Sequence, residues 1–165
     1  AIAHTKEEGL EMLRDGVTTV LLLDGWGQGG PKGPVQWGPA EFTLFALGFE
    51  GNTTLRILGV GGFMLDVAGC KVLAKCLEGN TTLQELQLQK CGLNDAMAKE
   101  LAKGLESNAT LTTLDCNHNG IGAAGCATLF ESVKGNPNIQ VLGLEVDAQW
   151  ATNLKPSGRG GTRGH

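Results

Sequence analysis

The chain has 165 residues, enough for one domain with a hydrophobic core and too few to expect two. Hydrophobic residues make up 41% and charged residues 18%, which is a globular composition, and the formal net charge of −4 argues against nucleic-acid binding. No apolar stretch approaches the roughly 20 residues that cross a bilayer, so we expect no membrane-spanning segment.

The first predicted element is an N-terminal capping helix within residues 1–16. Apolar residues between Glu7 and Arg14 recur at helical spacing. The apolar run Val20–Leu23 then has the length of a buried strand. It opens a repeat domain that we expect to extend over residues 17–147.

An insertion at about residues 26–39 separates this strand from the next predicted helix. It contains Trp26, Lys32 and Trp37 together with three prolines. Long departures from a repeat often carry function, and Trp is enriched at the centres of protein interfaces. The insertion is therefore predicted to contact a partner. The alternative, that the two indoles cover the open end of the core, stays open.

A distorted repeat unit surrounds this insertion. Gly16–Val20 matches Gly51–Leu55 at a distance of 35 residues, which predicts seven extra residues between strand and helix. The helix that follows realigns with the later units, because Phe42, Phe45 and Phe49 take the places of Cys70, Leu73 and Leu77.

Four asparagine motifs begin 28 residues apart, at Asn52, Asn80, Asn108 and Asn136. Each is followed by the spacing Leu-x-x-Leu-x-Leu, whose last two side chains fall on one face of a strand. Apolar residues at three- and four-residue steps then predict a helix. Gly-Asn or Ser-Asn pairs end these helices, and both residue types tolerate the left-handed conformation that closes a helix.

The repeat closely resembles the ribonuclease-inhibitor-like class of leucine-rich repeats. Leu83–Leu93 carries that family's segment with Cys91 at its Asn/Cys position, and Leu111–Ile121 repeats it with Asn119 there. The resemblance implies an α/β leucine-rich-repeat solenoid of about 4–5 repeats. An arc of parallel strands would line its concave face, and helices would cover its convex face.

In that architecture the residues between the inward leucines face the concave side. We expect them to form columns that bind a protein partner, although any single position could be only a solvated strand residue. The predicted concave face consists of Arg56, Ile57, Gln84, Glu85, Gln87, Thr112, Thr113, Asp115, Gln140 and Val141.

The C-terminal segment 148–165 forms a basic, glycine-rich tail. Lys155, Arg159 and Arg163 lie in its last eleven residues, where there is no acidic residue. We expect this tail to pack against a partner with an acidic surface.

The sequence offers one arrangement that resembles reactive chemistry, Cys116-Asn117-His118. Cys116 aligns with Leu88 and Val60, so its thiol should point into the core and behave as a small hydrophobic group. The glycine-rich stretches lack the spacing of dinucleotide or phosphate loops. We therefore expect no catalytic residues, no metal and no cofactor, and a chain that is not an enzyme.

Five cysteines, an odd number without paired metal spacing, favour a reducing intracellular compartment, either cytoplasmic or organellar. Asn52, Asn80 and Asn108 also satisfy the Asn-x-Thr pattern for glycosylation. We attribute that pattern to the repeat itself, because the free cysteines argue against secretion.

These observations predict a protein–protein interaction module, an accessory or structural subunit docked in a larger multiprotein assembly. The alternative is a regulator of a partner enzyme in trans, inhibitor-like or GTPase-activator-like. The activator class uses a distinctive set of arginines or asparagines at the strand edges. In this chain we find only Arg56 at such a position.

Overall fold

The computed structural model describes residues 2–3, 6–23, 38–134 and 136–145. Strands and helices alternate along this part of the chain. They are β1 (Ile2–Ala3), α1 (Lys6–Arg14), β2 (Val20–Leu23), α2 (Pro39–Phe49), β3 (Ile57–Gly59), α3 (Val67–Gly79), β4 (Glu85–Gln87), α4 (Asp95–Leu105), β5 (Thr113–Asp115), α5 (Ala123–Val133) and β6 (Val141–Gly143).

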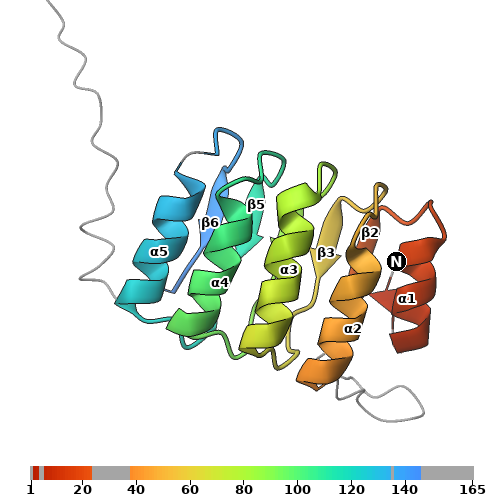
Figure 1. Cartoon of the computed structure of the whole chain (residues 1–165), viewed down its shortest axis with the longest axis horizontal. Helices are drawn as coiled ribbons and strands as arrows, with labels where there is room; N and C mark the ends of the chain where they lie inside the picture. The colour runs from red at the N-terminus through yellow and green to blue at the C-terminus, as the bar shows by residue number, and fades with distance from the viewer. Residues whose placement is uncertain (1, 4–5, 24–37, 135, 146–165) are drawn as a thin grey trace, which may run out of the picture.

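The strands form one parallel sheet in the sequential order β1-β2-β3-β4-β5-β6. The helices lie side by side in a second layer that covers one face of the sheet (Figure 1). Each helix is the crossover that a parallel connection between neighbouring strands requires. The expected α/β leucine-rich-repeat solenoid is confirmed, with about five repeats.

Stacked leucines form the core between the two layers. Leu58, Leu86, Leu114 and Leu142 pair in register across the four C-terminal strands, and the first three are fully buried. On the helix side, the apolar stripe of each repeat packs onto them. The three phenylalanines of α2 are buried, as their alignment with Cys70, Leu73 and Leu77 predicts.

The register of β2 differs from the one that sequence matching predicts. Leu21 pairs with Leu58, 37 positions later, whereas the later pairs are 28 positions apart. The repeat is therefore lengthened by nine residues between β2 and α2 and not by seven. Burial decides the register, since Leu21 is completely buried and is the strand's central inward side chain.

No pattern in the sequence predicts β1. Its two residues pair with Leu22 and Leu23 and extend the sheet beyond the first full repeat. The N-terminal helix α1 therefore follows a strand and packs beside α2. A two-residue strand has no periodicity that a sequence pattern could reveal.

A column of asparagines connects the repeats at the turn from helix to strand. The Asn108 side chain accepts hydrogen bonds from the backbone of Thr110 and Leu111 at 3.1 and 2.9 Å. Its amide donates to the carbonyl oxygens of Leu77 and Asn80 at 2.8 and 3.1 Å. Asn52, Asn80 and Asn136 repeat this arrangement, each donating to a carbonyl of the preceding repeat. We call these four residues the asparagine ladder.

At the ends of α3 and α4, the ladder takes the place of the left-handed residues that the sequence predicts there. Asn80 has φ −84° and ψ 128°, which is extended backbone, so its side chain, not a left-handed residue, closes the turn. Left-handed residues occur after the strands, at the equivalent positions Gly62, Lys90 and His118, and after helices α1 and α2, at Gly16 and Gly51. The prediction was wrong at these turns because the asparagine closes them with side-chain hydrogen bonds and does not adopt a left-handed backbone conformation.

Asp15 occupies the ladder position of the first repeat. Its carboxylate accepts hydrogen bonds from the backbone of Val17 and Thr18 at 2.9 and 2.8 Å, as Asn52 does from Thr54 and Leu55. Hydrogen bonds from the Thr18 hydroxyl and from these two amides lower the pKa of Asp15. An aspartate at this position accepts the same kind of backbone hydrogen bonds as an asparagine, but it has no amide group that could donate one to a carbonyl.

Helices α3 and α4 approach closely because Gly104 has no side chain. A Cβ atom at this position would lie 2.2 Å from the Ala74 carbonyl oxygen, well inside van der Waals contact. The contact is between backbone atoms, so no side chain can move aside to relieve it.

We expect Asn108→Ala to lower the free energy of unfolding by about 3 kcal/mol, because it leaves buried backbone donors and acceptors without partners. Urea unfolding monitored by circular dichroism measures the change. Asn138→Ala, at an exposed asparagine with one hydrogen bond to Ala109, should cost about 1 kcal/mol or less. Equal losses in the two variants would show that the ladder is not a main source of stability.

Gly104→Ala should destabilise the protein by about 2 kcal/mol, although Ala favours helices by about 1 kcal/mol over Gly. The matched control is Gly79→Ala in α3, where an added Cβ meets nothing within 4 Å. That control should leave urea stability unchanged or slightly increased. A stabilised Gly104→Ala variant would contradict the close backbone contact.

Candidate protein-interaction surface

The structure places the predicted concave residues in three rows across the sheet. Two rows consist of residues paired in register: Ile57, Glu85, Thr113 and Val141, then Gly59, Gln87, Asp115 and Gly143. The third consists of Arg56, Gln84, Thr112 and Gln140, joined by backbone hydrogen bonds of 2.7–2.8 Å. All ten predicted side chains are half-buried or exposed, so we call this set the concave face.

Side-chain hydrogen bonds order the middle of the concave face. The Gln87 amide donates to the Glu85 carboxylate at 2.5 Å, and the Gln89 amide donates to Asp115 at 2.6 Å. Asp115 also accepts from the Asn117 backbone at 3.0 Å. The repeat pattern does not predict Gln89 and Asn117, because they lie just beyond the strand positions that it marks.

Glycines flank this polar centre. A Cβ atom at Gly59 would lie 3.1 Å from the Gln87 side-chain oxygen, and one at Gly143 would lie 2.7 Å from an Asp115 carboxylate oxygen. The small residues leave room for Gln87 and Asp115 to lie across the sheet. The carboxylates and amides therefore form a central polar strip that can accept and donate hydrogen bonds.

The other predicted contacts lie outside the described residues. This applies to Trp26, Lys32 and Trp37 in the insertion and to the tail residues Lys155, Arg159 and Arg163.

Cys116 and His118 do not form a reactive pair. The Cys116 side chain is buried, and burial raises the pKa of its thiol, which leaves it protonated. His118 points elsewhere, with its Nδ1 atom 2.7 Å from the Glu145 carboxylate, and both side chains are more than half exposed. Among the described residues, no three His, Cys, Asp or Glu side chains are grouped to hold a metal.

The Asn-x-Thr motifs are structural at the positions where they are most buried. Asn108 is 3% exposed and Asn80 is 9% exposed, and each side-chain amide donates to a backbone carbonyl. A glycan on either nitrogen would break the asparagine ladder. This supports attributing the motif to the repeat.

The comparisons with known proteins agree with the architecture. A leucine-rich-repeat family model matches residues 79–102 and 107–130. No curated protein matches the sequence. Among solved structures, leiomodin-1 actin-binding site 2 has a TM-score of 0.66 and 18% identity, with 90% of this chain and 86% of that one covered. Such a likeness shows the fold alone, an α/β leucine-rich-repeat solenoid. In the described part of the chain, no helix is long and apolar enough to cross a membrane.

The buried thiols predict a loss of stability at alkaline pH. Burial raises the pKa of Cys76 to about 11 and those of Cys70 and Cys91 to about 12, from an ordinary value of 9.0. The unfolded chain loses its thiol protons at a lower pH than the folded chain does. The free energy of unfolding is therefore unchanged below about pH 9 and falls as the pH rises toward 11. The sequence has no Tyr to titrate in the same range.

Urea unfolding at about pH 8 and about pH 10.5 tests this, and Cys76→Ala should show a smaller loss than the parent chain. Native thiols should also resist Ellman's reagent at neutral pH. Equal stability at both pH values would contradict the prediction.

Proposed function

We propose that this chain is a protein–protein interaction module of the ribonuclease-inhibitor-like class that binds its partner on the concave face. The observation that carries the proposal is the alignment of the three rows across β3–β6. Stacked repeats present such rows as one continuous surface to a macromolecule.

The chemistry of the concave face suggests the character of the partner. Glu85 and Asp115 place two carboxylates near the centre, and Arg56 lies exposed toward the N-terminal side. A partner surface with basic or amide donors at its centre would complement this pattern. The hydrogen bonds among Gln87, Glu85, Gln89 and Asp115 hold these groups in place before binding, which reduces the entropy lost on association.

We further propose that the module is an accessory or structural subunit of a larger intracellular assembly. Four to five repeats make only a shallow arc, which suits docking more than enclosure of a partner. The insertion, with Trp26, Lys32 and Trp37, and the tail, with Lys155, Arg159 and Arg163, would add contacts specific to this protein. The domain division into 1–16, 17–147 and 148–165 belongs to the same proposal.

Regulation of a partner enzyme in trans is the alternative function. The solved relative is described as an actin-binding site, so actin is one partner worth testing, although 18% identity carries over no binding residue. A regulator would change the catalytic rate of its partner, whereas a structural subunit would change the partner's assembly.

Affinity purification from source cells followed by mass spectrometry should recover a stoichiometric partner. Glu85→Arg should weaken that complex about tenfold or more, because it reverses a charge at the centre of the concave face. Glu131→Arg makes the same change on the exposed side of α5 and should leave the affinity unchanged. Recovery of no stoichiometric partner, or equal effects of the two variants, would refute the proposal.

A further inference from the structure

The helix layer carries a block of four lysines on its outer surface. Lys71 and Lys75 are one helical turn apart on α3, and Lys99 and Lys103 occupy the equivalent positions on α4, 28 residues later. All four are exposed. Because α3 and α4 pack side by side (Figure 1), the four ammonium groups belong to one surface.

Local carboxylates neutralise only part of this charge. The Glu100 carboxylate accepts from Lys103 at 2.7 Å, and this bond, with the nearby charges of Lys71 and Lys99, lowers the pKa of Glu100. Among the described residues, Lys71, Lys75 and Lys99 form no ion pair. The block therefore remains positive on a chain whose net charge is −4.

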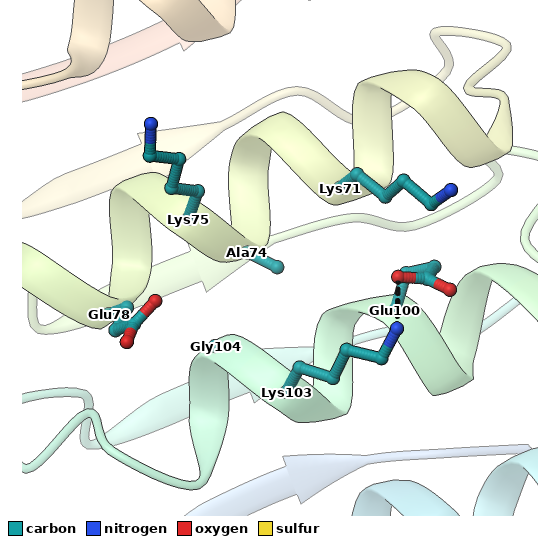
Figure 2. A pocket seen from close by; sticks show the side chains of 7 residues that line it. All are labelled: Lys71, Ala74, Lys75, Glu78, Glu100, Lys103 and Gly104. Carbon is teal, nitrogen blue, oxygen red and sulfur yellow. Dashed lines mark hydrogen bonds and ion pairs between the residues drawn. The ribbon is translucent and has the colours of Figure 1, made fainter.

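A shallow pocket of about 160 Å³ lies between the two helices inside this block. Figure 2 shows Lys71 and Lys75 on one side, and Lys103 reaching Glu100 on the other. Its floor is formed at Ala74 and Gly104, where the close helix contact leaves no large side chain. The pocket has room for a protruding apolar side chain, with lysine stems around it.

Exposed leucines continue this surface onto α2. Leu44 and Leu47 keep 53% and 48% of their area exposed. Leu47 stands where the next two repeats have Lys75 and Lys103, so the row changes from apolar to basic across adjacent helices. Apolar residues cover the opposite side of α2 as well, since its three phenylalanines are buried. A helix that has apolar residues on both its inner and its outer side is normally covered by another element.

We infer that the outer face of α2, α3 and α4 is a second docking surface, which binds an acidic amphipathic segment of a partner protein. Apolar side chains of that segment would cover Leu44 and Leu47 and enter the pocket over Ala74. Its carboxylates would face the lysine block. We call this surface the convex site, and it goes beyond the proposed binding on the concave face.

The charge pattern favours a protein segment over an anionic membrane. Glu78 and Glu50 are exposed beside the lysines and would meet the same negative headgroups. Among the described residues of α2, α3 and α4, only Leu44, Leu47 and Val67 are exposed large apolar residues. A peptide can place each carboxylate opposite a lysine and avoid the glutamates, whereas a uniformly charged surface cannot.

Selection of a phage-displayed random peptide library against the full chain tests the convex site. We expect the enriched peptides to combine Leu or Phe with several Asp or Glu. Fluorescence polarisation should then show that Lys75→Glu/Lys103→Glu weakens binding about tenfold or more, and that Leu44→Ser/Leu47→Ser does likewise. Thermal melting confirms that these surface variants remain folded.

Glu85→Arg on the concave face is the matched control and should leave binding of the selected peptides unchanged. Loss of peptide binding in this control, peptides without acidic residues, or insensitivity to both convex variants would overturn the inference. Sedimentation with phosphatidylcholine vesicles containing phosphatidylserine should show no binding, and binding that depends on the same lysines would overturn it in favour of a membrane. Because the two faces have separate variants, the concave proposal can fail without affecting this one.

Discussion

The amide-to-carbonyl hydrogen bond of the asparagine ladder is the constraint on which the repeat depends. A helix that ends directly before a buried strand leaves carbonyl and amide groups without water to bind them. Asn80 and Asn108 satisfy both kinds of group with one side chain and reach into the preceding repeat as well. The hydrogen bonds of one asparagine side chain therefore both close the turn and hold one repeat on the next. No hydrophobic residue could replace it, because the groups to be satisfied are polar and buried.

The ladder fixes the stacking of successive repeats, and the surfaces on both sides of the solenoid follow from this. A constant offset of 28 residues aligns Leu86 with Leu114 in the core and Glu85 with Thr113 on the concave face. The same offset aligns Lys71 with Lys99 on the helices. Small sequence differences between repeats then become rows of changing chemistry. Function in such a protein depends on the residues in these surface rows, because the core positions are nearly identical from repeat to repeat.

The two faces have opposite electrostatic character. Carboxylates and amides around Glu85 and Asp115 occupy the concave centre, and lysines with exposed leucines occupy the convex site. A thin solenoid separates them by one layer of strands and one of helices (Figure 1). Under the concave and convex proposals, one chain would contact two different partner surfaces on opposite sides of the solenoid.

The sequence by itself determined the repeat, the inward leucines and the burial of Cys116, because each depends on local spacing that recurs several times. The predicted concave positions follow from the same alternation. Tertiary structure alone decided the register of Leu21, the role of Asp15 as a ladder residue and the bond from Gln89 to Asp115. It also decided the close contact at Gly104. These features depend on which residues of neighbouring repeats meet, and a linear pattern carries no distance between side chains.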